Sequence, residues 1–311
     1  MIVSLIRERL PWMLVVLLTI SVLCFVLFDL DPADPATLLL QAQGLETITE
    51  ADLAAKREEL RLDEPLFLRY VGWLSDAIHG DLGHSYRTYT PVLDLYLNKL
   101  PNTLLLAILA TGVSFLISLP LGMLAAFFHR SWVDRVIQFF VILVAAIPGF
   151  WLAFMLIVLF AVTLRWLPAF GTPTPAGVIL PVTVLALQKT AVLTRLARSA
   201  ALDALGQSWM HMANAKGVPP LRRGFHHLLP AVLGPMLPVS GLEFANLMTG
   251  AAVVEYVFAW PGIGKLAIDS VIGADMPVVV GFCLFAGLTF VVVNLLIDVI
   301  TLIVDPRLRN P

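Results

Sequence analysis

The stretch LPNTLLLAILATGVSFLISLPLGMLAAFF, residues 100–128, decides the class of fold, because its 29 consecutive residues contain no charged side chain. About 20 mostly apolar residues are enough for a helix to cross the hydrocarbon layer of a membrane. In lipid every backbone N–H and C=O has to be paired inside the segment, so we expect an α-helix here. The whole chain agrees: 59% of its 311 residues are hydrophobic, 14% are charged, and the mean hydropathy is +0.88. A soluble domain with one core cannot bury so much apolar side chain, so most of the protein is expected to face lipid.

Outward from this stretch, five more segments are apolar and long enough to span. The six predicted spans are residues 10–28, 100–128, 136–164, 178–202, 229–258 and 277–304. Several exceed the minimum length, and prolines lie inside them or at their ends: Pro120, Pro148, Pro181, Pro235 and Pro238. Membrane helices tolerate such prolines when neighbouring groups satisfy the freed carbonyls, so tilted or broken helices are expected. The predicted fold is all-α, a polytopic membrane protein with six transmembrane helices in one transmembrane domain over residues 1–311.

The distribution of Lys and Arg predicts the side on which each loop lies. Basic residues precede the first span, separate the second from the third and the fourth from the fifth, and follow the sixth: Arg7, Arg9, Arg130, Arg135, Lys216, Arg222, Arg223, Arg307 and Arg309. With six crossings these four regions share one side, so both termini are expected in the cytoplasm. Residues 30–98, with twelve acidic against five basic side chains, are then expected in the periplasm.

We expect this outer segment, residues 30–98, to form a small helical cap. A helix is predicted over residues 49–60 with Thr49 as its N-cap, and a second, amphipathic helix is predicted after Pro65. The first span follows a basic stretch, as in a signal peptide, but its apolar run is longer than usual and no small-x-small cleavage site follows it. A retained anchor is therefore the favoured interpretation.

A polar island, residues 203–228, separates the fourth and fifth spans and is predicted to be cytoplasmic. It contains His211-Met-Ala-Asn-Ala-Lys-Gly217 and, after nine intervening residues, His227-Leu-Leu-Pro230 follows. We expect a helix broken at Gly206, a positive φ at Gly217 and a sharp turn at the following Pro219-Pro220. One interpretation is an ordinary basic loop that only sets topology. The glycine-to-proline spacing favours the other, a short rigid helix offered to a soluble partner.

This spacing resembles the coupling loop of ABC importer permeases, E-A-A-x-x-x-G followed after nine residues by I-x-L-P. Gly217, Leu229 and Pro230 fall at the glycine, leucine and proline of that pattern, and Ala213 keeps its second alanine. His211 and Met212 replace the glutamate and the first alanine, and His227 replaces the isoleucine. The match is therefore good in spacing and partial in residue identity.

Further motifs, in order along nearly the whole chain, resemble the peptide/nickel branch of these permeases. They are Asp34-Pro-Ala36, Gly80-Asp-Leu-Gly-His-Ser85, Pro91-Val92, Phe150-Trp-Leu-Ala-Phe154, Trp166-Leu-Pro168, Glu255-Tyr-Val-Phe-Ala-Trp-Pro-Gly-Ile-Gly264, Asp275-Met-Pro-Val278 and Asp305-Pro-Arg-Leu-Arg309. Within the branch, residues 150–154, 165–168 and 258–264 most resemble nickel permeases. Gln41-Ala-Gln-Gly44 resembles the early outer loop of permeases for nickel, cobalt or zinc bound to opine-type metallophores.

The resemblance implies a multi-pass permease subunit of an ABC importer in the bacterial inner membrane, a translocase pore and not an enzyme. It implies a second homologous permease, two ATP-binding subunits that hydrolyse ATP, a periplasmic or lipid-anchored substrate-binding protein, and surrounding membrane lipid. The residues implied to couple to the ATPase are His211, Met212, Ala213, Ala215, Lys216, Gly217, Arg222, Arg223, His227, Leu229 and Pro230. The cargo expected from it is nickel or another transition metal, free or as a metallophore complex. The alternative is a di- or oligopeptide, and an exporter or a channel remains open as a different class.

Few polar groups lie at membrane depth. Glu243 and Asn246 are one turn apart in the fifth span, and an ionisable residue there is costly and usually faces a cavity or a partner. For Glu243, a place on the transport pathway and a structural partnership both stay open. The sequence predicts no resident metal site, no cofactor, no catalytic set and no nucleic-acid-binding surface. Gly262-Ile-Gly-Lys265 lacks the first glycine and the Ser or Thr of a P-loop, so no ATPase is expected in this chain.

Overall fold

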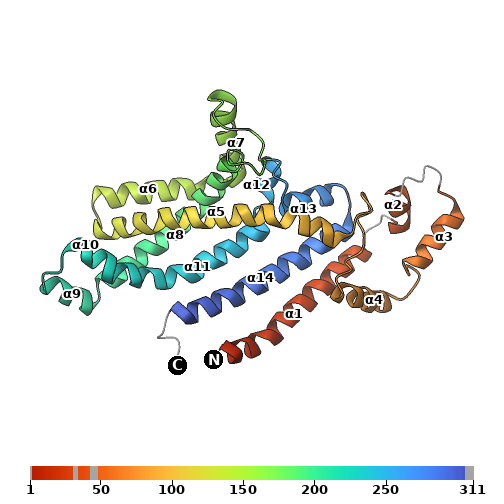
Figure 1. Cartoon of the computed structure of the whole chain (residues 1–311), viewed down its shortest axis with the longest axis horizontal. Coiled ribbons are helices and arrows are strands. Elements are labelled where there is room, and N and C mark those ends of the chain that lie inside the picture. The colour runs from red at the N-terminus through yellow and green to blue at the C-terminus, as the bar shows by residue number, and fades with distance from the viewer. Residues whose placement is uncertain (1, 31–33, 43–47, 305–311) are drawn as a thin grey trace. The chain divides into compact units, whose positions relative to one another are not determined.

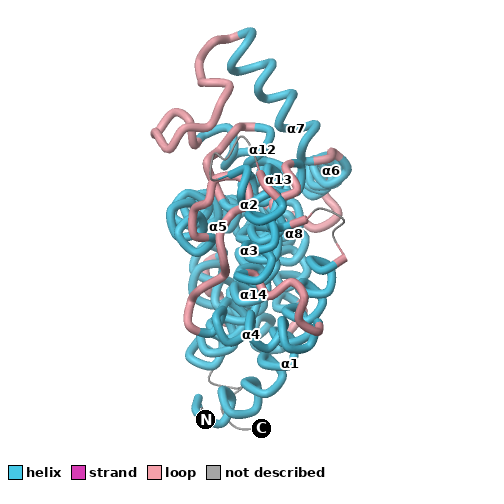
Figure 2. The backbone as a smooth tube through the Cα atoms, turned by 90° about the vertical axis from the view of Figure 1, so that its right-hand side faces the viewer, coloured by secondary structure: helices cyan, strands magenta, loops and turns pink. Residues whose placement is uncertain are grey.

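The computed structural model describes residues 2–30, 34–42 and 48–304, and over these ranges the protein consists of helices joined by loops (Figures 1 and 2). No strand forms within them, and His84 and Pro91 make an isolated antiparallel bridge. The all-α prediction is therefore confirmed. Two of the sequence motifs, Asp305–Arg309 and the end of residues 41–44, lie outside the described residues.

The chain divides into two compact units. The first comprises Met1–Ile2, Leu104–Trp260 and Val292–Pro311, and the second comprises Val3–Thr103 and Pro261–Val291. Two long helices, α5 (Val92–Phe127) and α14 (Met276–Val304), contribute residues to both units.

The first unit is organised around α8 (Ile179–Leu205), which packs against α6 (Trp132–Ala146), α7 (Gly149–Leu156), α11 (Leu229–Gly250) and α12 (Ala252–Val257). The contact with α11 is the most extensive, and Figure 1 shows the two helices running beside each other. Alanines of α8 face this core, and Leu228, Val232 and Met236 fill it from the other side. Small side chains let helix backbones approach closely in a membrane, where packing drives helix association.

The predicted third span, residues 136–164, is not one helix. It consists of α6 followed by α7 with its π-helical continuation η1 (Ile157–Thr163), and the two parts are bent by 99°. The break falls at Ile147, whose extended backbone (φ −85°, ψ 123°) precedes Pro148. Proline disfavours the helical region for the residue before it and supplies no N–H itself, which explains where the helix ends.

Among the described residues, four helices are long and apolar enough to cross a membrane: Val92–Phe127, Ile179–Leu205, Pro220–Thr249 and Met276–Val299. The bent pair makes a fifth if both of its parts form one span. The apolar part of α1 (Ile2–Asp29), Pro11–Val26, is shorter than these. The exact number of six crossings therefore remains a prediction. The fifth predicted span also ends earlier than expected, since α11 stops at Gly250 and Glu255 lies in the separate helix α12.

The second unit contains the predicted cap helices. The two predicted ones are α3 (Glu50–Glu59) and α4 (Leu66–Ile78). The unit also contains α2 (Pro35–Ala42), which was not predicted, and α13 (Ile263–Ile272). Thr49 caps α3 as predicted: its side chain accepts from the Asp52 N–H, and the Asp52 carboxylate accepts from the Thr49 N–H. This reciprocal pair is a capping box.

Polar and aromatic contacts fasten the outer helices of this unit to its membrane helices. The Tyr70 hydroxyl of α4 lies 2.8 Å from Ser21 Oγ of α1, and the Phe25 ring packs against both Tyr70 and Trp73. Between two of the long helices, the Tyr96 hydroxyl of α5 donates to the Val278 carbonyl of α14 at 2.6 Å. Aromatic side chains with one polar end are typical of the zone where membrane helices meet water.

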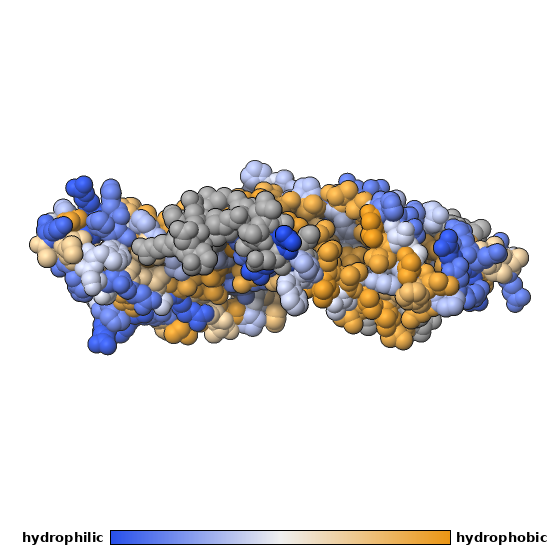
Figure 3. Space-filling model, turned by 90° about the horizontal axis from the view of Figure 1, so that it is seen from below, coloured by the Kyte–Doolittle hydropathy of each residue, from blue (hydrophilic) through white to orange (hydrophobic). Residues whose placement is uncertain are grey.

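Large apolar side chains are exposed on many helices, and Figure 3 shows broad apolar areas on one face of the molecule. Leu116, Phe139 and Val162 are 72%, 61% and 60% exposed. Contiguous apolar surface of this extent is not found on a soluble monomer, and it suits lipid or another membrane subunit.

Candidate functional site

The polar island of the sequence forms a compact helical segment in the first unit. The helix α8 ends at Leu205, Gly206 caps it, and α9 (Ser208–Ala215) follows. The short helix α10 (Pro220–Arg223) and the π-helical segment η2 (Gly224–Leu228) then lead into α11. The helix break predicted at Gly206 is confirmed. We call residues 206–228 the coupling segment.

The turn of this segment lies at Gly217, which has a φ of +74°. Its N–H donates to the Asn214 carbonyl, and the Val218 N–H donates to the Ala213 carbonyl. These two bonds satisfy carbonyls at the end of α9 in the manner of a Schellman motif, which takes glycine at the left-handed position. The positive φ predicted from the sequence is confirmed, and the prolines that follow start α10 at Pro220.

One face of the coupling segment is anchored and the other is exposed. Met210 and Ala213 of α9 are buried, and Met210 packs into the core formed by α8 and α11. In contrast, Met212 is 57% exposed, Leu221 is 77% exposed and Phe225 is 65% exposed. Exposed apolar side chains of this kind suit a surface for another protein or for lipid, and Leu221 and Phe225 lie at the start of the candidate span Pro220–Thr249.

The predicted coupling residues are distributed over this segment as follows. The helix α9 contains His211, Met212, Ala213 and Ala215, and Lys216 caps it. The helix α10 contains Arg222 and Arg223, η2 contains His227, and α11 starts with Leu229 and Pro230. Arg223 donates to the Asn214 side chain at 2.6 Å, which ties α10 to α9. The His227 ring lies 6.4 Å from the Trp209 ring. These contacts hold the parts of the segment together.

A second site in the first unit is a cavity of about 470 Å³. Its lining residues come from α7, α8, α11 and α12: Gly149, Phe150, Leu185, Gln188, Lys189, Asn246, Leu247, Thr249, Val253 and Val254. Gly149 at the start of α7 lies against the Gln188 side chain of α8, and an added Cβ would come 2.8 Å from the Gln188 amide nitrogen.

The two predicted pathway residues have different places at this cavity. Asn246 lines it. Glu243 stands one turn away on α11 and forms an ion pair with Lys189 of α8, with Lys189 Nζ 2.5 Å from Glu243 Oε2. Both side chains are largely buried, 22% and 13% exposed. Glu243 therefore has a largely buried ion-pair partner, and that partner, Lys189, lines the cavity.

The cavity has three polar residues that the sequence did not predict for it: Gln188, Lys189 and Thr249. Lys189 lies within the predicted fourth span, and an ionisable residue inside a span is by itself a signal of a cavity or a buried partner. The exposed Leu221 and Phe225 were not predicted either, because the coupling-loop pattern leaves their positions unspecified.

The sequence matches known protein families over nearly its whole length. Residues 118–310 match the family described as "Binding-protein-dependent transport system inner membrane component", and residues 1–107 match its N-terminal companion family. The chain belongs to this family. It is a multi-pass permease subunit of an ABC importer.

Similar permeases extend over the whole chain. A putative peptide transport system permease protein of Brucella melitensis biotype 1 is 35% identical over 99% of both chains. The oligopeptide transport system permease protein AppB of Bacillus subtilis is 37% identical over 94% of this chain and 95% of that protein.

A solved structure of the MetNI methionine ABC transporter in an inward-facing conformation resembles the permease with a TM-score of 0.59. It covers 68% of this chain and 96% of that one at 19% sequence identity. At this identity the likeness bears on the fold alone, and it supports the helical permease architecture.

Proposed function

We propose that the permease is one of two pore subunits of an importer for di- or oligopeptides. The observation that carries this proposal is the similarity, over nearly the full chain, to permeases named for peptide and oligopeptide transport. The nickel and metallophore interpretation drawn from short sequence motifs has no support in these names. A di- or oligopeptide, the alternative cargo of the sequence analysis, therefore replaces the transition metal expected first.

The chemistry of the cavity favours the same choice. The Glu243 carboxylate forms an ion pair with Lys189, so its charge is already balanced and is less available to a metal ion. Among the described residues no group of three or more His, Cys, Asp or Glu side chains comes together. An ammonium has three N–H donors and Glu243 occupies one side of it, so Lys189 can also donate to a passing carboxylate.

The amide side chains of Asn246 and Gln188, beside Lys189, suit the backbone groups of a peptide. Each side-chain amide has N–H donors and a carbonyl acceptor, the same kinds of group that a peptide bond has. Few and weak contacts of this kind are what a pathway needs, because a tight site would slow release. This role of Lys189 and Asn246 is part of the proposal.

The coupling segment is proposed to transmit ATP-driven motion. Its exposed Met212, Leu221 and Phe225 would dock on an ATP-binding subunit, and its anchored face would pass the displacement to α8 and α11. The complex would contain a second homologous permease, two ATP-binding subunits that hydrolyse ATP, and a periplasmic or lipid-anchored substrate-binding protein. Both termini are proposed to lie in the cytoplasm and residues 30–98 in the periplasm.

Uptake by a deletion strain tests the cargo. We expect loss of uptake of radiolabelled di- to pentapeptides, restored by the wild-type gene, while uptake of nickel, cobalt and zinc stays unchanged. Loss of metal uptake with normal peptide uptake would reverse the choice of cargo. Ion conduction by the isolated chain in vesicles without ATP-binding subunits would instead favour a channel, and peptide efflux from loaded cells an exporter.

A further inference from the structure

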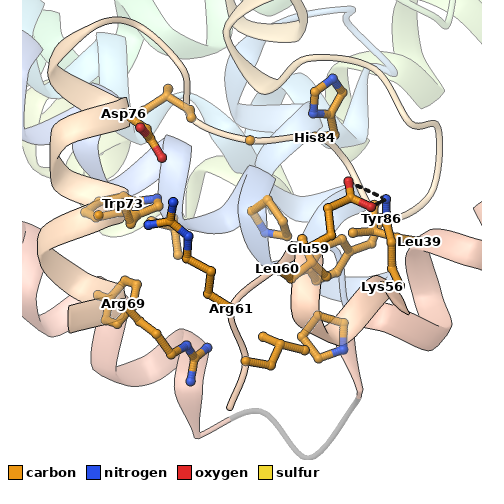
Figure 4. Close-up of a pocket in the computed structure, with 18 of the residues that line it drawn as sticks. Leu39, Lys56, Glu59, Leu60, Arg61, Arg69, Trp73, Asp76, His84 and Tyr86 are labelled. Carbon is orange, nitrogen blue, oxygen red and sulfur yellow. Dashed lines mark hydrogen bonds and ion pairs between the residues drawn. The ribbon is translucent and has the colours of Figure 1, made fainter. Parts of the chain in front are cut away.

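The second unit contains a cavity that plays no part in the proposed transport function. It has a volume of about 420 Å³ (Figure 4). Its walls come from helices that leave the membrane and from the outer segment: Phe25 of α1, Leu39 of α2, Lys56 of α3, Trp73 of α4 and Val280 of α14 all line it.

The charged residues of this cavity are mostly basic. Its lining includes three cations, Lys56, Arg61 and Arg69, and two carboxylates, Glu59 and Asp76. Lys56 Nζ bonds Glu59 at 2.8 Å, so that carboxylate is already neutralised by a neighbour. Figure 4 shows the Arg61 side chain reaching toward Trp73 and Asp76. Three cations against two carboxylates leave this cavity with one excess positive charge, in a segment whose net charge is strongly negative.

The backbone at Arg61 supports a functional reason for its guanidinium. Arg61 follows the last turn of α3 with a φ of +55°, and the Leu62 N–H bonds the Arg57 carbonyl. This is the left-handed position after a helix where glycine is usual, and any other residue there is strained. Tyr89, another lining residue, also has a positive φ, +53°. An arginine at a position that favours glycine is compatible with a use for its guanidinium in the cavity.

The cavity brings apolar side chains of the long helices together with basic side chains of the outer segment. Phe25 and Val280 belong to the membrane helices α1 and α14, whereas Lys56 and Arg61 belong to the outer segment. Arg69 connects the two zones, since its guanidinium lies 5.9 Å from the Phe25 ring centre. A phospholipid likewise joins apolar acyl chains to a charged phosphate.

We propose that this cavity binds the headgroup of an anionic phospholipid. Arg61 and Arg69 contact the phosphate, for which the planar guanidinium is well suited, and Trp73 packs beside the glycerol as aromatic residues do at membrane interfaces. Phe25 and Val280 contact the first part of an acyl chain. Basic pockets between membrane helices are known to take such headgroups.

Retention of lipid by the purified transporter tests this site. The complete complex is extracted in mild detergent, and its retained phosphatidylglycerol and phosphatidylethanolamine are quantified by mass spectrometry. We expect enrichment of phosphatidylglycerol over the bulk membrane, reduced about fivefold in Arg61→Gly. Equal enrichment in wild type and Arg61→Gly would overturn the proposal.

Arg61→Gly is the decisive variant because glycine fits the backbone at this position, so the fold should be at least as stable while the guanidinium is lost. Arg130→Gly is the matched control, since Arg130 also has a positive φ, +63°, but does not line the cavity. Lipid retention by Arg130→Gly should equal that of the wild type, and a loss as large as in Arg61→Gly would overturn the proposal.

The delipidated complex distinguishes a lipid from a small anion. We expect dihexanoyl phosphatidylglycerol to raise the unfolding temperature of the wild type and of Arg130→Gly by several degrees, and that of Arg61→Gly by much less. The same rise with inorganic phosphate alone would reassign the cavity to a free anion. The same rise with dihexanoyl phosphatidylcholine would show that charge is not recognised, and either result would overturn the lipid assignment.

Discussion

At the residue scale, Gly217 has the clearest physical requirement. Its φ is +74°, and no atom lies within 4 Å of the place where a Cβ would stand. A side chain there meets no neighbour, so the whole penalty is that of the left-handed backbone, about 1–2 kcal/mol for an L-residue. A β-branched residue is least compatible with this conformation.

Gly217→Val should therefore alter the turn of the coupling segment without affecting membrane insertion. We expect normal levels of the variant in the membrane, no transport, and weaker co-purification of the ATP-binding subunits. Gly206→Ala is the control, because Gly206 flanks the same helix with an ordinary φ of −78° and a Cβ there has ordinary contacts. Normal uptake by Gly217→Val would contradict the coupling role.

The Lys189–Glu243 pair leads to a second prediction at this scale. Removing one partner of a buried ion pair leaves an uncompensated charge and costs about 3–5 kcal/mol. Lys189→Met or Glu243→Gln alone should therefore lower the unfolding temperature of the purified complex. The double variant Lys189→Met/Glu243→Met should recover most of that stability.

Peptide uptake distinguishes a pathway role from a purely structural one. If Lys189 contacts cargo, the double variant is stable but still takes up peptides several-fold more slowly than the wild type. Full recovery of uptake together with stability would show that the pair only holds α8 to α11.

At the scale of helices, small residues decide how closely the helices pack. Gly122 of α5 faces α8, and an added Cβ would come 2.8 Å from the Arg198 nitrogen and 2.9 Å from the Thr194 carbonyl oxygen. Both are backbone atoms, which cannot move aside as the end of a side chain can. The approach of α5 and α8 therefore depends on the missing side chain at this position.

Gly122→Ala should separate the two helices and destabilise the permease by about 1–3 kcal/mol, as overpacking does. Gly112→Ala, on the same helix, places its Cβ in open space and should be neutral or slightly stabilising. Thermal unfolding of the two purified variants checks this, and equal unfolding temperatures would show that α5 and α8 adapt freely.

The sequence predicted where helices start and stop better than how they continue. Thr49 and Gly217 act through hydrogen bonds to residues within five positions, so their roles could be predicted from the local sequence. The prolines were recognised as possible breaks. Only the structure showed that Pro148 bends its span by 99° while Pro235 and Pro238 stay inside α11. Whether a freed carbonyl is satisfied depends on neighbouring helices, which the local sequence does not specify.

At the scale of the whole molecule, the orientation in the membrane is the prediction that most needs a test. Ser75 is exposed on α4 of the second unit, and Asn310 lies outside the described residues. In a background without Cys24 and Cys283, a cysteine at Ser75 should react with a membrane-impermeant thiol reagent in intact cells, and one at Asn310 should react only after lysis. The opposite pattern would invert the predicted topology.

The sequence by itself determined the helical membrane class, the polar coupling segment and, through its motifs, the transporter family. These properties depend on composition, on the length of apolar runs and on residues close together in the chain. The cargo suggested by short motifs was not supported, because such motifs are shared among permeases with different substrates.

Only the tertiary structure decided which side chains meet. Glu243 has a partner because α8 and α11 pack along their length, and Arg61 shares a cavity with Val280 although more than two hundred positions separate them. The helical period predicts which residues share a face, but it does not say which helix that face will contact. Cavities and buried ion pairs arise from that choice of neighbours, and for this reason they appear first in the folded chain.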